Sequence, residues 1–231
     1  MRFNKSIGMT MLVMFSLLVL IVLGLPYTLN TVAQGFALEG RFQTGISMNW
    51  FYAHLFGTSV ALLLGPLQFS NQILVKYRQA HRGLGRGYLF FGSMGSIAGL
   101  VMTRGIIAGL IGAAGFGLMA ILWLITGVTA LVMIRSRQVK RHKQWMIRNY
   151  ALTWAALTLP LWLRVLMALG SVFLLDPIYV GDSEALFIDV YGLATWLAWI
   201  PNLLLAEWLF IRRSRPRKKV TTSAALSSML S

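Results

Sequence analysis

The chain has 231 residues, of which 57% are hydrophobic and only 12% are charged. Soluble domains are roughly 45 to 50% apolar and about 25% charged, so this composition excludes an ordinary soluble enzyme or a disordered chain. It indicates an integral membrane protein. Because the sequence contains no cysteine, disulfides, thiolate metal sites and a cysteine nucleophile are also excluded.

Six stretches are apolar and long enough to cross a bilayer core, which needs roughly 20 residues per helix. They are residues 7–25, 49–75, 88–104, 116–134, 150–175 and 188–211. The segment 87–134 is nearly continuous and is broken only by Arg104 and by glycines. One helix of that length would be more than twice as long as the core is thick, at about 1.5 Å per residue. We therefore expect the glycine-rich stretch 105–117 to form a turn.

The basic residues predict the orientation of these spans. Eighteen of the 21 Lys and Arg lie before the first span, in the connections 76–86 and 135–148, or after residue 211, whereas five of the six acids lie on or near the other side. By the positive-inside rule both termini are cytoplasmic. The net charge of +15 is then a topology signal that favours contact with anionic lipids and gives no reason to expect nucleic acid.

These observations predict an all-α integral membrane protein with six transmembrane helices in one bundle. Residues 1–211 form the transmembrane domain, with residues 7–25 kept as a helix instead of being cleaved as a signal peptide. Residues 212–231 form a basic cytoplasmic tail whose Ser, Thr and Ala content is typical of disorder.

The two basic connections resemble each other. Each contains a histidine followed by a base, then a short gap, an arginine, any residue and an aromatic residue that leads into an apolar helix. The residues are His81, Arg82, Arg86 and Tyr88 in the first connection, and His142, Lys143, Arg148 and Tyr150 in the second. One interpretation is a parallel repeat of helical hairpins, related by an axis along the membrane normal. The other is that basic loops entering helices commonly look like this.

The same segments carry a family resemblance. His54, the stretch His81-Arg82-Gly83-Leu84-Gly85-Arg86-Gly87-Tyr88, the stretch 142–153 and the pair Leu163-Arg164 resemble the predicted membrane proteins grouped as domain of unknown function 2306. The resemblance covers roughly residues 49–175, and its most specific part is the string His-x-x-Trp-Met-Ile-Arg at 142–148. Lys143 stands where that family has arginine. The resemblance implies a six-helix protein of the bacterial inner membrane and implies no reaction.

Besides Arg104 and Asp189 at span ends, His54, Arg164 and Glu207 lie within the predicted spans, where a charge costs at least about 2.5 kcal/mol on insertion scales. By helical rise, His54 and Arg164 each lie about 8 to 9 Å below the outer boundary and share one layer. Arg164 then contacts a ligand or serves as a structural hydrogen-bonding hub. Glu207 lies near the inner boundary, where we expect it to pair with a base: Arg86, Arg148 or Arg212.

Two prolines lie inside the fifth and sixth spans. Pro160 removes the hydrogen-bond donor to the carbonyl of Ala156, and Pro201 does the same for Leu197. We expect both helices to kink in their inner halves.

The sequence carries no HExxH, GxSxG or Walker signature, so it names no reaction and leaves open whether the protein is an enzyme. We expect a module that binds a small hydrophobic or anionic ligand, a quinone or a lipid. Its candidate site is either His54 with Arg164 or the rim formed by His81, Arg86, His142, Trp145 and Arg148. An alternative is a redox protein with a single b-type haem ligated by His81 and His142. A third interpretation is a secondary transporter. For the rim histidines, a purely structural role is a further alternative.

Overall fold

The computed structural model describes residues 48–106, 108–170 and 182–212, and the regular structure in these ranges is helical throughout. The predicted first span and the basic tail beyond residue 212 lie outside these ranges. In chain order the elements are α3 Met48–Gln68, α4 Asn71–Lys76, α5 Arg78–Met102, the 3-10 turn η2 Thr103–Gly105, α6 Gly109–Arg135, α7 Val139–Thr153, α8 Ala155–Leu169, α10 Ser183–Leu197, α11 Ile200–Ala206 and the π-helical turn η4 Glu207–Ile211.

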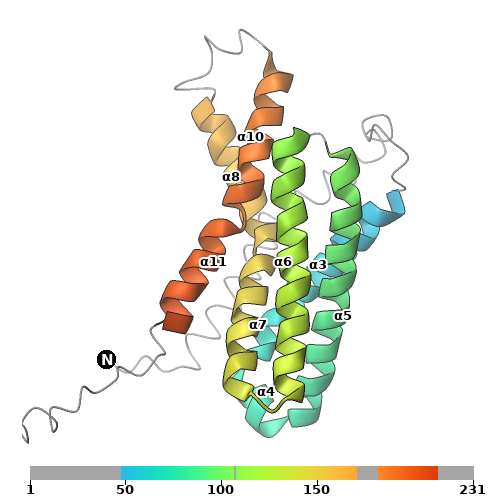
Figure 1. The fold of residues 1–231 in the computed structure, drawn as a ribbon, viewed down its shortest axis with the longest axis vertical. Coiled ribbons are helices and arrows are strands. Elements are labelled where there is room, and N and C mark those ends of the chain that lie inside the picture. Colours follow the sequence, from blue (N-terminus) through green and yellow to red (C-terminus); the bar gives the residue numbers. More distant parts are fainter. Residues whose placement is uncertain (1–47, 107, 171–181, 213–231) are drawn as a thin grey trace, which may run out of the picture.

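Helices α3, α5, α6 and α7 form a four-helix bundle (Figure 1). Each of them packs against its two neighbours in the order α3, α5, α6, α7 and back to α3, so α5 and α7 face each other along a diagonal of the bundle. The buried apolar residues at its centre include Leu62, Tyr88, Trp123, Met146 and Tyr150. Helix α10 packs on α6 and α8, and α11 packs on α7, beside the bundle.

Close contact between α3 and α5 depends on glycine. A methyl group added at Gly57 would lie 2.7 Å from the carbonyl oxygen of Phe91, and one added at Gly95 would lie 2.9 Å from the hydroxyl of Thr58. Neither position has room for a residue larger than glycine, because Cβ atoms in proteins essentially never lie this close to another atom. Small residues at helix interfaces let membrane helices approach closely, since packing rather than water exclusion holds them together.

Within the described ranges, four helical segments are long and apolar enough to cross a membrane: Asn49–Gln68, Gly109–Arg135, Val139–Leu169 and Glu184–Ile211. They correspond to the predicted second, fourth, fifth and sixth spans. The predicted third span lies within α5, whose apolar part is diluted by the glycines and serines between Tyr88 and Met102.

The turn between α5 and α6 is shorter than the glycine content suggested. It occupies residues 103–108, and α6 begins at Gly109, whose φ of 61° is a left-handed conformation that favours glycine. Gly112 and Gly115 lie inside α6, where a side chain would collide with Ala108 at Gly112 and with Thr195 of α10 at Gly115. Gly115 therefore permits α6 to pack closely on α10, and neither glycine forms the turn.

Helices α5 and α7 begin well before the apolar stretches that predicted them. The predicted third and fifth spans start at Tyr88 and Tyr150, whereas α5 starts at Arg78 and α7 at Val139. The additional turns are built from residues such as Arg, Lys, Gln and Ala, which favour helix although they are not apolar. The segments that we expected to be loops are thus basic extensions of the two helices.

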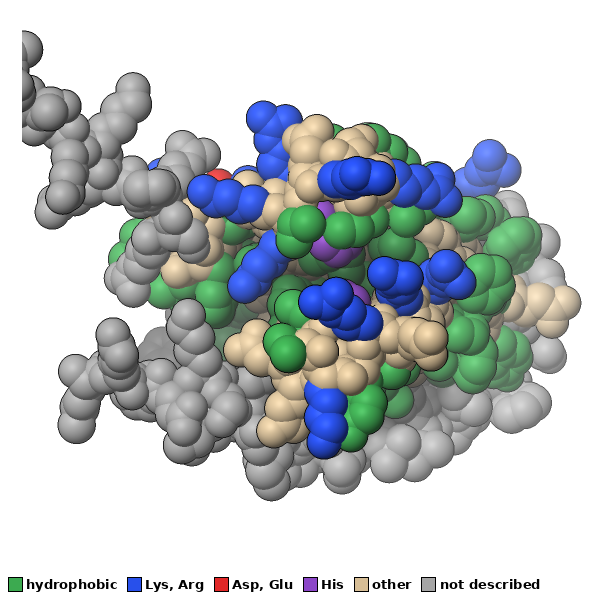
Figure 2. All heavy atoms as spheres, turned by 90° about the horizontal axis from the view of Figure 1, so that it is seen from below, with side chains coloured by type: hydrophobic (Ala, Val, Ile, Leu, Met, Phe, Trp, Pro, Cys, Tyr) green, Lys and Arg blue, Asp and Glu red, His purple; other side chains and the backbone are tan. Residues whose placement is uncertain are grey.

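Basic side chains collect at one end of the bundle, which we call the basic end. Here α4 and the first turns of α5 meet the last turn of α6 and the start of α7 (Figure 1). Figure 2 views this end and shows Lys and Arg distributed around it. Apart from Arg148, the bases of the two predicted connections are therefore on the same end: Lys76, Arg78, Arg82, Arg86, Arg135, Arg137, Lys140, Arg141 and Lys143.

The absence of native cysteine permits a direct test of this arrangement. Arg82 and Lys143 are exposed at the basic end, and Leu110 is exposed at the other end of α6. We expect single variants Arg82→Cys and Lys143→Cys to react with a membrane-impermeant maleimide from the same side of the membrane. Leu110→Cys should react only from the opposite side. Labelling of the first two from different sides would show that this bundle is not the folded protein.

Candidate functional site

The histidines of the two basic segments occupy equivalent positions. His81 is the fourth residue of α5, and His142 is the fourth residue of α7. Seven residues further along each helix lie Tyr88 and Asn149, on the same face and about two turns away. The Tyr88 hydroxyl donates a hydrogen bond of 2.6 Å to Asn149 Oδ1. Because α5 and α7 run in parallel, this bond holds the two histidines at one level of the bundle.

The two imidazole rings have different hydrogen-bond environments. His142 Nδ1 donates to the carbonyl oxygen of Ala130 on α6 at 2.8 Å, which leaves Nε2 as the atom with a free lone pair. His81 Nδ1 is buried and has no partner in the described part of the chain. Buried polar atoms are nearly always paired, and leaving one unpaired costs about 1 to 3 kcal/mol. The site therefore has an unused hydrogen-bonding position beside an oriented imidazole.

Burial and the neighbouring imidazole both lower the pKa of His81 below its usual value. Burial disfavours the charged ring because it loses water, and His142 disfavours it because a second positive charge would lie nearby. His81 is consequently neutral at pH 7. Figure 2 shows histidine side chains near the centre of the basic end, with Lys and Arg around them. The arrangement is a polar centre inside a cationic rim, to which Arg86 contributes an exposed side chain on α5.

A hydrogen-bonded cluster fills the bundle directly above the histidines. Asn149 Nδ2 donates to the Trp123 carbonyl at 2.7 Å and to Thr126 Oγ1 at 2.8 Å. The Trp123 indole donates to Thr153 Oγ1 at 3.0 Å, which also lies 3.0 Å from the Tyr88 hydroxyl. The members of this cluster satisfy one another, so its role is to fix the register of α5, α6 and α7.

Arg148 and Trp145 are held by partners within the protein. Arg148 contacts Glu207 Oε2 through Nε at 3.0 Å and through Nη2 at 2.8 Å, which joins α7 to η4. Its guanidinium also lies 4.7 Å from the centre of the Trp145 ring. The prediction that Glu207 pairs with a base is confirmed, and the base is Arg148. Because of these contacts, Arg148 and Trp145 have a structural role at the edge of the basic end.

The structure does not bring His54 and Arg164 together. His54 lies in α3 and donates through Nδ1 to the carbonyl of Gly95 at 2.7 Å, in a space that Gly99 leaves open. Arg164 is exposed on α8, which packs mainly on α10. Equal depth on separate helices was the only basis for pairing these residues, and depth alone does not determine which helices are neighbours.

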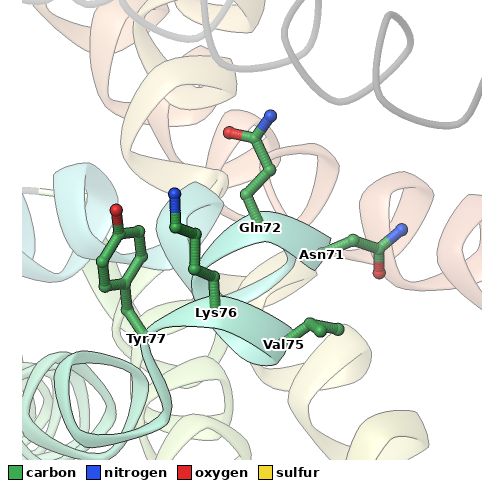
Figure 3. Close-up of a pocket in the computed structure, with 5 residues that line it drawn as sticks. All are labelled: Asn71, Gln72, Val75, Lys76 and Tyr77. Carbon is green, nitrogen blue, oxygen red and sulfur yellow. The ribbon is translucent and has the colours of Figure 1, made fainter.

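The described residues contain no three-ligand metal cluster, and the hollow found among them does not involve the predicted site residues. No group of three His, Asp or Glu side chains lies close enough to hold a metal ion in these ranges. An open hollow is lined by Asn71, Gln72, Val75, Lys76 and Tyr77 (Figure 3). Its walls come from the short helix α4 and the residue after it, so it is a surface depression separate from the histidines.

Sequence reasoning missed the polar cluster. Asn149 and Thr153 lie seven and eleven residues after His142, which places all three on one face of α7. An asparagine near the start of an apolar segment was the available signal, since such a residue needs a partner in the bilayer. The partners themselves, Trp123 and Thr126, could not be identified without knowing that α6 packs on α7.

The fold and the apolarity of its helices define a polytopic α-helical membrane protein. The chain belongs to the family described as predicted membrane protein (DUF2306), whose model matches residues 51–210. This match confirms the resemblance drawn from the sequence motifs. Searches of curated proteins and of solved structures returned no match.

The polar cluster should contribute measurably to stability. Asn149→Ala removes three hydrogen bonds and leaves the Trp123 carbonyl and Thr126 hydroxyl without this donor. At about 0.6 to 1 kcal/mol for each bond between membrane helices, we expect a loss of roughly 2 kcal/mol in unfolding free energy. Titration of the detergent-solubilised protein with a denaturing detergent would measure it.

Asn71→Ala is the matched control, because Asn71 is exposed on α4. We expect this variant to stay within about 0.5 kcal/mol of the wild type. Equal stability of Asn149→Ala and wild type would contradict the role of the cluster.

Proposed function

We propose that this protein is a membrane-embedded binding module, and that its ligand is an amphipathic molecule carrying negative charge, of the lipid class, held at the basic end. The observation that carries the proposal is the buried, unpartnered Nδ1 of His81 opposite the oriented ring of His142. A ligand that supplies a hydrogen-bond partner would remove the free-energy cost of leaving that atom buried and unpaired.

The cationic rim favours an anion over a neutral ligand. Arg82, Arg86 and Lys143 are exposed around the histidines, whereas the nearest described acid, Glu207, is already paired with Arg148. Anionic groups of a ligand would interact with these bases, and its apolar part would lie against the bundle or the surrounding lipid. A neutral quinone would make no use of this rim.

The same charges support a cytoplasmic position for the basic end. Positive residues concentrate in cytoplasmic connections of membrane proteins, and the inner leaflet carries most of the anionic lipid. The proposal therefore places the ligand site at the inner surface of a bacterial inner membrane, with anionic lipids as the immediate partners of the rim.

Native mass spectrometry of the protein purified in a mild detergent tests this function. We expect the wild type to retain a bound anionic lipid-like molecule, and His81→Ala to lose most of it. His54→Ala is the matched control, because His54 lies on α3 away from the basic end and bonds to Gly95. Retention of the same molecule by His81→Ala would contradict the proposal, as would a wild-type protein that carries no ligand.

A single b-type haem is a second candidate, favoured by the geometry of His142. Histidines that bind metals usually donate their second ring nitrogen to a carbonyl or carboxylate, and His142 donates Nδ1 to Ala130. His81 and His142 lie at equivalent positions of the parallel helices α5 and α7, at one level of the bundle. The residues present therefore fit the group: the histidines would hold the iron, and Arg82 or Arg86 the propionates. When bound, such a group would supply one-electron transfer.

An optical spectrum distinguishes the two candidates. If haem is bound, the purified protein shows an intense Soret band, and either His81→Ala or His142→Ala abolishes it. His54→Ala should leave the band unchanged, because two ligands remain in place. A colourless, folded protein from cells supplied with haem precursor would eliminate the haem candidate. The proposal of a lipid-like ligand would still stand.

A further inference from the structure

Two membrane-spanning segments are interrupted near their midpoints. The segment Val139–Leu169 breaks at Trp154, between α7 and α8, and the segment Glu184–Ile211 breaks at Ala198 and Trp199, between α10 and α11. By helical rise each break lies roughly 18 to 23 Å from either end of its segment. Ala198 and Trp199 are therefore close to the middle of the sixth predicted span. Trp154 lies only about 6 Å beyond Tyr150, where the apolar stretch of the fifth span begins, so this break is in the inner half of the bilayer, where Pro160 led us to expect a kink.

The two breaks lie side by side. Thr158 of α8 donates to the carbonyl oxygen of Ala198 at 2.6 Å. Asn202 of α11 donates to the same carbonyl at 2.8 Å and lies 3.1 Å from Thr158 Oγ1. Backbone that leaves the helix at membrane depth is tolerated where it is buried in protein or lines a cavity, and interrupted helices often form the binding sites of membrane proteins.

One donor at the breaks remains unused. Trp199 is 5% exposed, and its indole Nε1 has no acceptor among the described residues. The neighbouring Trp196 differs, because its Nε1 donates to the Ile111 carbonyl at 3.2 Å. Trp123 likewise donates to Thr153. An indole nitrogen can only donate, so the missing partner of Trp199 must be a hydrogen-bond acceptor.

We propose that the paired breaks bind the carbonyl oxygen of a neutral, membrane-soluble ligand of the quinone type, with Trp199 Nε1 as the donor. A neutral ligand fits because a charged one would lose its hydration at this depth without gaining a counter-ion. A flat ring fits because Trp196 lies 5.9 Å from Trp199 with ring planes 37° apart, which places an aromatic wall beside the donor. This site is separate from the basic end and goes beyond the function proposed above.

A single water molecule is a less suitable occupant. Buried waters typically make about three hydrogen bonds to groups that are otherwise unpaired. Here the side chains of Thr158 and Asn202 are already bonded to Ala198 and to each other. Trp199 would be left as the principal partner of such a water, whereas a quinone gains most of its affinity from apolar contact and needs few hydrogen bonds.

Nitrogen-15 labelling of the eight tryptophans allows the donor to be observed directly. With the full chain in phosphatidylcholine nanodiscs, the probe is decylubiquinone, and Trp199→Phe assigns the Trp199 indole resonance by its absence. We expect that resonance to shift on titration of the wild type. We also expect Trp199→Phe, which keeps an aromatic ring, to weaken decylubiquinone binding about fivefold.

Trp50→Phe is the matched control, because Trp50 is 40% exposed at the start of α3 and takes no part in the proposed site. It should leave quinone affinity within twofold of the wild type. An unshifted Trp199 resonance at saturating decylubiquinone would overturn the proposal. If Trp199→Phe fails to fold, a spectrum in which no indole resonance shifts would overturn it. Equal affinity of wild type and Trp199→Phe would overturn it too. His81→Ala should bind the quinone normally, so failure of the basic-end site is distinguishable from failure of this one.

Discussion

The hydrogen bond between Tyr88 and Asn149 is the contact on which the arrangement of the bundle depends. In a bilayer the helices gain little from excluding water, so apolar packing alone leaves them free to slide along one another. The buried side chains of Tyr88 and Asn149 can be satisfied together at only one register of α5 against α7. That register brings His81 level with His142, so the chemistry of the basic end follows from a polar contact two turns away.

Features that depend on local composition could be predicted from the sequence. Apolarity located the spans that now lie in α3, α6, α7–α8 and α10–η4, and counting of bases grouped the connections at one end. The pairing of Glu207 was predictable because it is the one acid near many bases, and a charge at the membrane boundary needs a partner. The choice of Arg148 over Arg86 required knowledge of how η4 lies against α7.

Features that depend on which helices are neighbours could not be predicted. Helical rise gave His54 and Arg164 similar depths, yet His54 faces α5 and Arg164 is exposed on α8. The glycines of α6 looked like turn residues because a sequence does not distinguish a glycine that bends the chain from one that admits a neighbouring helix. For the same reason the prolines indicated irregular helices without placing the breaks, which lie at Trp154 and at Ala198 to Trp199.

Depth in the membrane separates the chemistry of the two proposed sites. The basic end lies where side chains reach water, so exposed bases there cost little and can attract an anion. At the level of Trp199 a charge has no such support, and hydrogen bonds between neutral groups are the remaining source of specificity. Helix α7 starts at the first site with His142 and ends at the second beside Trp154. The two sites can therefore select ligands of opposite character while sharing one rigid element whose register Asn149 fixes.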